Sequence, residues 1–311
     1  MAAIRIGVIG LGKIAQDQHL PVIAKNPEFK LVAVTSQRGL GAPGANTYAT
    51  ATAMYDREPE IDAVAICTPP QVRHALAKEA LLAGKHVMLE KPPAATTSEL
   101  VDLERIARGA GKVLFTTWHS QYNQAVDEAK ARLSGQVVTR LQVTWKEDVR
   151  HWHPGQAWIW EAGGFGVFDP GINALSIVTK IMPEPIFVTK ADLETPANKD
   201  APIAAQLSFS NGRKDSRLAA VFDWRQTGPQ TWDIDIETQA GPRLTLTHGG
   251  SKLLVDGSLM IEEKPEEYER IYDRFAELVR TNTSEVDHDP FRLVADAFLL
   301  GRRVETDAFE D

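Results

Sequence analysis

Short apolar runs alternate with longer amphipathic stretches over the first 118 residues. Five runs, rich in Val and Ile, have the pattern of buried strands: Ile4 to Ile9, Leu31 to Thr35, Ala63 to Thr68, Val87 to Glu90 and Val113 to Thr117. Three stretches with helical spacing separate them: Lys13 to Lys25, Val72 to Ala83, and Ser98 to Arg108 with Ser98 as a candidate cap. Nearly continuous apolar strands alternating with helices are typical of a parallel sheet that is covered on both faces.

The pattern changes after residue 121. We expect helices near Asn123 to Leu133 and within Gly171 to Ile181, and closing helices at Pro265 to Arg280 and Phe291 to Val304. Six strand candidates lie between them: Val137 to Trp145, Ile186 to Leu193, Ile203 to Phe209, Ser216 to Trp224, Trp232 to Thr238 and Arg243 to Thr247. Successive strands separated by Gly, Pro and Asn turns predict an open, largely antiparallel sheet in an α+β domain.

A chain of 311 residues is longer than one hydrophobic core comfortably supports. The prediction is therefore an α/β protein with two domains. Residues 1–120 form a Rossmann dinucleotide-binding domain, and residues 121–311 form an α+β domain for substrate binding and oligomerisation.

Composition excludes several classes of function. A net charge of -8 repels the phosphate backbone, so nucleic acid is not expected as a partner. The sequence has neither the pattern of an export leader nor an apolar run of about 18 residues, so we expect no membrane anchor. The single cysteine, Cys67, lies in an apolar run and fits burial in a reducing, cytoplasmic protein.

The first strand leads directly into Gly10-Leu11-Gly12-Lys13-Ile14-Ala15, a G-x-G-x-x-A pattern between a strand and a helix. Gly10 permits a tight turn, Gly12 lets the backbone approach a pyrophosphate, and Ala15 keeps the helix close to the sheet. The helix N-terminus at Lys13 and Ile14 faces the anion. The sequence therefore predicts a dinucleotide site, and a glycine turn without a ligand is the alternative.

The end of the second strand bears on the choice of cofactor. An NAD-specific site usually has Asp or Glu about 20 residues beyond the glycines, where it accepts hydrogen bonds from the adenosine ribose. This chain instead has Thr35-Ser36-Gln37-Arg38. Ser36 and Arg38 are available to bind a 2′-phosphate, so we expect NADP or NAD, with NADP slightly favoured. A solvated surface role is the alternative for Arg38.

Two further strands end in residues that point to chemistry, because ligands bind at the carboxyl edge of such sheets. Thr68-Pro69-Pro70 either shapes a nicotinamide pocket or simply begins the next helix. Glu90-Lys91-Pro92 places a lysine beside the expected nicotinamide. Further along, Asp169 and Asn173 are four residues apart and share one face if that segment is helical.

At these residues the chain resembles the glucose-fructose oxidoreductase and inositol dehydrogenase family (Gfo/Idh/MocA). The Rossmann domain, the Glu-Lys-Pro motif and a later Asp-x-x-x-His pair match in order over essentially the full length, except that Asn173 stands in the histidine position. The segments from Lys146 to Arg150 and from Trp152 to Gln156 resemble bacterial members that act on D-galactose or L-arabinose. The resemblance implies NAD(P)-dependent oxidation of such an aldose at C1 to the aldonolactone.

The resemblance also implies catalytic roles. Lys91 would stabilise the developing oxyanion, as the lysine of the family does. Asparagine does not accept a proton at neutral pH, so Asn173 would hold a substrate hydroxyl and another group must act as base. Asp169 is the first candidate for that base, and His153 is the second because histidine titrates near neutral pH.

Discriminating a sugar requires directed hydrogen bonds and apolar ring contacts. Glu147 and His153 are candidates for binding hydroxyls, with surface ion pairing as the alternative for both. Trp145, Trp152, Trp158, Trp160 and Trp232 gather in the second domain. We expect Trp152 and Trp232 to contact the sugar, although any single tryptophan is more often core. His119, just beyond the strand ending near Trp118, is a further substrate-binding candidate, with a structural role as the alternative.

Other functions fit less well. His151, His153 and Glu147 are a poor metal set without thiolates nearby, so no metal is expected. An inositol or other polyol dehydrogenase is the alternative enzyme, and a non-enzymatic regulator that senses NADP or a sugar is the alternative outside catalysis. The expected partners are a small sugar and further copies of the chain, because the open face of the second sheet is predicted to leave an apolar patch.

Overall fold

A computed structural model describes residues 2–264 and 266–310. The chain forms two compact units, one of Met1–His119 with Glu266–Asp287 and one of Ser120–Pro265 with His288–Asp311. In the part of the chain that is described, no helix is both long and apolar enough to cross a membrane.

The first unit is built on a six-stranded parallel sheet in the order β3-β2-β1-β4-β5-β6. The strands are β1 (Ile4–Ile9), β2 (Phe29–Thr35), β3 (Asn46–Tyr48), β4 (Ala63–Ile66), β5 (His86–Leu89) and β6 (Leu114–Thr116). The chain runs outward from β1 to β3 and then returns to place β4 on the other side of β1. This order is that of the Rossmann fold, and ligands bind where it reverses, between β1 and β4.

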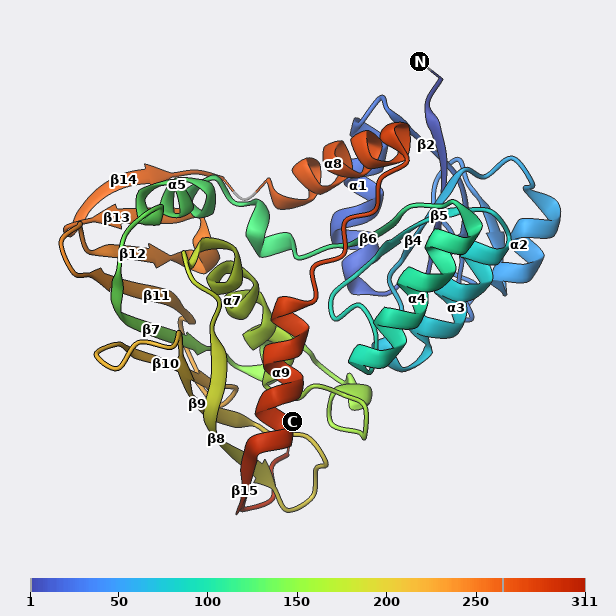
Figure 1. Cartoon of the computed structure of the whole chain (residues 1–311). Helices are drawn as coiled ribbons and strands as arrows, with labels where there is room; N and C mark the ends of the chain where they lie inside the picture. Colours follow the sequence, from blue (N-terminus) through green and yellow to red (C-terminus); the bar gives the residue numbers. More distant parts are fainter. Residues whose placement is uncertain (1, 265, 311) are drawn as a thin grey trace. The chain divides into compact units, whose positions relative to one another are not determined.

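The helices of this sheet are η1 (Ala15–His19), α1 (Leu20–Lys25), α2 (Ala51–Arg57), α3 (Pro70–Leu82) and α4 (Thr97–Ala110). Figure 1 shows α3 and α4 on one side of the sheet and α1 on the other, as right-handed crossovers in opposite directions require. The expectation that Ser98 caps α4 was wrong. Thr96 is the N-cap, because its side chain accepts the Glu99 N–H while the Glu99 side chain accepts the Thr96 N–H.

Helix α8 (Glu267–Thr281) and the segment after it belong to the first unit, although the sequence places every residue after 120 in the second domain. The apolar face of α8 packs into the first unit, where Phe275 stacks with Phe29 and Phe115 at centroid distances of 6.2 and 6.0 Å. Beyond the helix, Glu285 pairs with Phe115 as a short parallel bridge. The predicted start of this helix, Pro265, lies outside the described residues.

The second unit contains a nine-stranded sheet in the order β14-β13-β12-β11-β7-β10-β9-β8-β15. Its strands are β7 (Val138–Lys146), β8 (Phe187–Pro196), β9 (Ala204–Ser210), β10 (Arg217–Asp223), β11 (Thr231–Thr238), β12 (Leu244–Thr247), β13 (Lys252–Val255), β14 (Ser258–Glu262) and β15 (Gly301–Thr306). Only the pairs β7–β10 and β8–β15 are parallel. The α/β class and the largely antiparallel second sheet are therefore confirmed.

Helices α5 (Gln124–Leu133), α7 (Phe168–Ile181) and α9 (Asp289–Leu300) cover one face of this sheet (Figure 1). The prediction that the last helix continues to Val304 was wrong. The chain is extended from Gly301 onward, where β15 pairs with β8. A Cβ on Gly301 would lie 2.5 Å from the Ala297 carbonyl oxygen, so this close turn requires glycine.

The other face of the sheet is mixed in character on its central strands. Outward positions of β7 carry Arg140, Gln142 and Thr144, and those of β11 carry Asp233 and Asp235, whereas β10 beside β7 carries Ala219 and Val221. The expected apolar patch is therefore interrupted by polar side chains on β7 and β11. Homo-oligomerisation remains a prediction.

Candidate active site

The glycine loop of the first unit has the geometry of a dinucleotide site. Gly10 has a φ of +91°, and a Cβ on it would come within 2.8 Å of Thr68 Cγ2. Glycine is therefore required at this position for two reasons, its left-handed backbone and the close approach of the loop after β4. A Cβ on Gly12 would meet no atom of the described chain within 4 Å. The backbone at Gly12 thus borders open space, which the close approach of a pyrophosphate requires.

Helical geometry begins at Lys13 and Ile14, directly after the glycines, as the motif predicts. The Lys13 ammonium is exposed and pairs with Asp17 one turn later. The predicted helix of 13–25 contains a π-helical turn, η1, before α1 continues it. Such wider turns are often found at functional sites.

Thr68 supplies a second feature of a ligand-binding site. Its hydroxyl oxygen is buried and has no hydrogen-bond partner among the described residues. Buried hydroxyls are normally satisfied, and this one lies where the sheet order reverses, beside Gly10. A cofactor bound over Gly12 is the kind of partner that this hydroxyl lacks. Pro69 is exposed at the N-cap of α3, and Pro70 occupies the first turn of that helix.

The residues that bear on NADP lie after β2. Arg38 is exposed in this loop. The hydroxyl of Ser36 is less available than expected, because it accepts the Leu40 N–H at 3.1 Å. Of the two predicted phosphate ligands, Arg38 is thus the more accessible.

Glu90 and Lys91 follow β5 at the carboxyl edge of the sheet. The Glu90 carboxylate is buried and accepts the backbone N–H of Lys91 at 3.0 Å. The Lys91 side chain is half-buried. Arg73 of α3 holds the same stretch from another direction, because its buried guanidinium donates to the carbonyl oxygens of Glu90, Pro92 and Thr68. The backbone on either side of Lys91 is therefore fixed by side chains that the sequence analysis did not single out.

His119 of the first unit has a structural partner. Its Nδ1 lies 2.9 Å from Glu267 Oε2, and its ring stacks with that of Tyr268 at 5.7 Å. Both contacts involve α8, which favours the structural alternative for His119. A contact with substrate remains a prediction.

Three predicted residues of the second unit come together at the start of α7. Asp169 lies in the first turn of this helix and is buried, and Asn173 lies one turn later. His153, which follows the short helix α6 (Val149–Trp152), places Nε2 3.4 Å from Asp169 Oδ2. The helix N-terminus stabilises the carboxylate of Asp169. The two candidate bases are thus neighbours that can share one proton.

Glu147 is buried between two indoles. Its Oε1 accepts the Trp224 N–H at 3.1 Å, and its Oε2 accepts the Trp232 N–H at 2.8 Å. This carboxylate therefore orients aromatic side chains. Trp224, omitted from the aromatic set of the sequence analysis, also lies 5.3 Å from the His153 ring.

The two tryptophans predicted to contact the sugar lie together. Trp152 and Trp232 are both half-buried, with ring centroids 5.3 Å apart. Trp232 also stacks with Trp145 at 5.7 Å. Trp145 itself is buried, and its indole N–H has no partner among the described residues. This region of the second unit thus offers apolar faces and hydrogen-bonding groups side by side, which is what a sugar requires.

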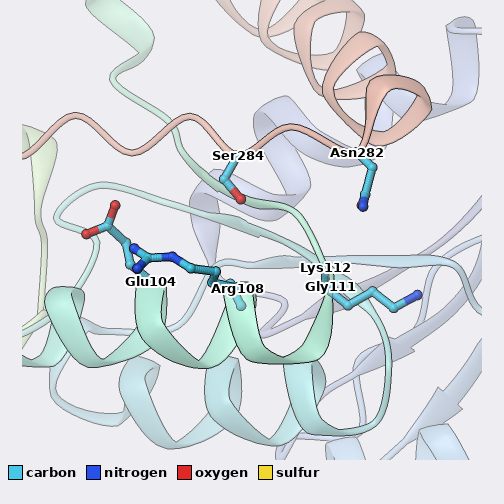
Figure 2. Close-up of a pocket in the computed structure, with 7 residues that line it drawn as sticks. Glu104, Arg108, Gly111, Lys112, Asn282 and Ser284 are labelled. Carbon is cyan, nitrogen blue, oxygen red and sulfur yellow. The ribbon is translucent and has the colours of Figure 1, made fainter.

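A hollow on the first unit has different chemistry. Figure 2 shows Glu104 and Arg108 of α4 on one side of it and Asn282 and Ser284, after α8, on the other. None of its lining residues is a predicted site residue. The C-terminal ends of α4 and α8 meet here, and the cations of Arg108 and Lys112 line the hollow at these negative helix ends, where positive side chains are favoured.

No metal is expected at His151, His153 and Glu147, and this expectation remains a prediction. His151 is exposed, with its ring edge-on to Trp152 at 4.9 Å. No group of three or more His, Cys, Asp or Glu side chains within residues 2–264 and 266–310 is arranged to hold a metal ion.

Comparisons with known proteins cover both units. A sequence profile of the oxidoreductase family with an NAD-binding Rossmann fold, GFO_IDH_MocA, matches residues 4–118. Galactose 1-dehydrogenase of Pseudomonas fluorescens is 44% identical and covers 100% of both chains. The crystal structure of D-galactose-1-dehydrogenase from Rhizobium etli is 55% identical, with a TM-score of 0.94 over 100% of this chain and 99% of that one. A 3-ketoreductase from Actinomadura kijaniata, solved with NADP, has the same fold at 17% identity, with a TM-score of 0.82 over 98% and 99% of the two chains.

Proposed function

Because this chain belongs to the Gfo/Idh/MocA family of oxidoreductases, we propose that it oxidises an aldose at C1 to the aldonolactone, with D-galactose and L-arabinose as substrates. The observation that carries the proposal is the extent of the similarity. The profile covers the Rossmann unit, whereas both galactose dehydrogenases match over the full chain. The similarity therefore includes the second unit, which is predicted to bind the substrate.

The first unit holds the nicotinamide dinucleotide. Gly10 and Gly12 admit the pyrophosphate, the helix at Lys13 and Ile14 presents its N-terminus, and the Thr68 hydroxyl gains a partner. The bound cofactor supplies the acceptor for the hydride that leaves C1 of the sugar. Arg38 binds the 2′-phosphate of NADP, and nothing in the loop after β2 repels it.

Proton removal falls to Asp169 and His153. Oxidation at C1 requires the anomeric hydroxyl to lose its proton as the hydride departs. The buried Asp169 accepts this proton, and His153 lies 3.4 Å away to share it. The Lys91 ammonium stabilises the negative charge that develops on the sugar oxygen.

Substrate preference follows from the polar and aromatic groups of the second unit. Asn173 holds a sugar hydroxyl through its amide, and Trp152 and Trp232 contact the ring. D-galactose and L-arabinose share the hydroxyl configuration from C2 to C4 and differ in the exocyclic hydroxymethyl group. A pocket that recognises the shared hydroxyls accepts both sugars.

Formation of reduced cofactor, followed by absorbance, tests the proposal. Purified protein is given NADP or NAD with D-galactose, L-arabinose, D-glucose or myo-inositol, and the product is identified by mass spectrometry and NMR. We expect lactone from the first two sugars and a loss of turnover on the order of 10²-fold or more in Lys91→Ala, with the cofactor still bound. A cyclic ketone from inositol would instead identify a polyol dehydrogenase. Cofactor binding without turnover of any sugar would indicate a sensor.

A further inference from the structure

A buried carboxylate in the first unit connects the loop that carries Lys91 to helix α8. Glu90 uses one oxygen, Oε2, to accept the N–H of Lys91 at 3.0 Å. Its other oxygen, Oε1, accepts the Tyr268 hydroxyl at 2.7 Å and lies 2.9 Å from His19 Nε2. The other ring nitrogen of His19 lies 2.8 Å from the Tyr272 hydroxyl. We call these four residues, His19, Glu90, Tyr268 and Tyr272, the Glu90 network.

The four members of the network come from three parts of the fold. His19 lies in the π turn after the glycine loop, Glu90 follows β5, and both tyrosines lie on α8. All four side chains are buried, and the His19 ring meets both tyrosine rings edge-on at 5.2 and 5.7 Å. The network is therefore rigid, and α8 supplies half of it.

The network keeps a negative charge on Glu90. Burial alone would raise the pKa of the Glu90 carboxyl, but the hydrogen bond and positive charge of His19, together with His119 and Tyr268, lower it to about 2. Burial alone would lower the pKa of His19, but its contacts with Cys67, Tyr272 and Glu90 raise it well above the ordinary value. A charged acceptor with several donors makes strong, directional hydrogen bonds.

We propose that His19 and Tyr268 are positioning residues for Lys91, which they fix by holding the Glu90 carboxylate that accepts the Lys91 N–H. The inference rests on the proposed role of Lys91 in sugar oxidation. Neither residue contacts the sugar in this proposal. Each acts by setting the position from which the ammonium reaches the developing oxyanion, and catalysis is sensitive to shifts of about 1 Å.

Single-group substitutions separate positioning from packing. Tyr268→Phe removes only the hydroxyl that donates to Glu90, and we expect kcat to fall about tenfold with the dissociation constant of NADPH unchanged. Tyr55→Phe is the matched control, because the Tyr55 hydroxyl of α2 is buried without a partner among the described residues. This control is expected to retain wild-type kcat. Wild-type kcat in Tyr268→Phe would overturn the proposal.

His19 offers a test by conservative rescue. His19→Gln keeps an N–H donor for Glu90 and should retain most of the turnover, whereas the similarly sized His19→Leu removes the donor and should lose it. Circular dichroism identifies any variant that does not fold. If the Leu variant is unfolded, the comparison between Tyr268→Phe and Tyr55→Phe still tests the proposal. Equal turnover in folded His19→Gln and His19→Leu would contradict the proposal.

The amide of Lys91 reports on the network without any substrate. In protein labelled with ¹⁵N-lysine, the Lys91 signal is identified by its loss in Lys91→Arg. We expect this signal to shift in Tyr268→Phe and to stay in place in Tyr55→Phe. A shift together with a wild type that oxidises no sugar would refute the proposed function and leave the coupling intact. An unmoved signal would refute the coupling, whatever the substrate.

Discussion

At the scale of single residues, the contact between His153 and Asp169 joins two candidates that sequence reasoning had to treat as alternatives. Their side chains lie 3.4 Å apart, with Asp169 buried and His153 partly exposed. A proton accepted by the buried carboxylate can therefore pass outward through the imidazole. We therefore propose different roles for the two, with Asp169 as the proton acceptor and His153 as the relay.

This division of roles predicts unequal losses. Asp169→Asn removes the acceptor, so kcat should fall on the order of 10²- to 10⁴-fold, while His153→Gln should cost less because water can replace a relay. Steady-state rates with D-galactose over a range of pH check both variants. The larger loss in His153→Gln would make histidine the base instead.

Arg38 gives a prediction about the cofactor. Arg38→Ala should weaken NADP binding roughly tenfold or more, since a charge-assisted hydrogen bond is lost, and should leave NAD binding unchanged. Fluorescence titration with the two reduced cofactors measures both affinities on one protein, so NADH acts as the internal control. Equal weakening of both would show that Arg38 shapes the loop rather than reading the phosphate.

Sequence spacing identified the residues of the glycine loop and of the Glu-Lys-Pro segment, because short motifs carry their own backbone geometry. It did not find Arg73, His19 or Trp224 as supporting residues. Arg73 lies 17 residues from Glu90 in sequence, Trp224 lies 77 residues from Glu147, and His19 lies 253 residues from Tyr272. Only the fold brings such pairs together.

At the scale of elements, β5 and β6 are joined by a side chain as well as by their backbone ladder. His86 Nδ1 accepts the Val113 N–H at 3.0 Å, which requires a neutral imidazole. Burial, followed by the charge of Lys112, lowers the pKa of His86 to about 4, although Asp62 opposes this shift. This edge of the first sheet is therefore sensitive to acid.

The proton of His86 makes the folded state less stable in acid, because the unfolded chain binds it more tightly than the folded chain does. The unfolded chain binds the His86 proton near pH 6.5, whereas the folded chain binds it only near pH 4. The contribution of the neutral His86 side chain to the free energy of unfolding is therefore complete above about pH 6.5, and it is lost as the pH falls through about 4. Urea unfolding near pH 7 and near pH 5 should show a smaller acid loss in His86→Gln than in wild type. His248→Gln, which alters an exposed histidine, should retain the wild-type loss. Identical losses in all three proteins would contradict the assignment.

Element prediction succeeded where strands are buried and failed where they are not. Every continuous apolar run of the first unit became a strand, but β3, with two exposed residues of three, gave no such signal. Strand β14 was missed for a similar reason, because four of its five residues are exposed. A strand that is buried on both faces has a continuous apolar run that the sequence shows, whereas an exposed edge strand has no comparable pattern.

At the scale of the whole molecule, helix α8 makes the first unit discontinuous in sequence, because residues 266–287 belong to it. Its apolar face was visible in the sequence, but an amphipathic pattern does not say which sheet the helix covers. Six of its side chains are buried: Tyr268, Ile271, Tyr272, Phe275, Ala276 and Leu278. At roughly 1.5–3 kcal/mol for each large side chain, this burial is comparable to the entire stability of a typical domain.

A fragment that ends at His119 should therefore not fold cooperatively. The same fragment joined by a flexible linker to 266–287 should fold, because it regains the helix that covers Phe29 and Phe115. Thermal unfolding followed by Trp118 emission compares the two, and Trp118 also donates to the Asp287 carbonyl oxygen in the intact unit. A cooperative transition in the shorter fragment at the same temperature would contradict the prediction.

The order of the chain has a consequence during synthesis. The ribosome releases the Rossmann strands first, then eight of the nine strands of the second sheet, β7 to β14, and only afterwards the helix that completes the first unit. Domains usually fold in the order in which they emerge. Here the unit that begins first lacks α8 until residues 266–287 have been translated, so we expect the apolar surface that α8 covers to stay exposed until Asp287 has left the exit tunnel.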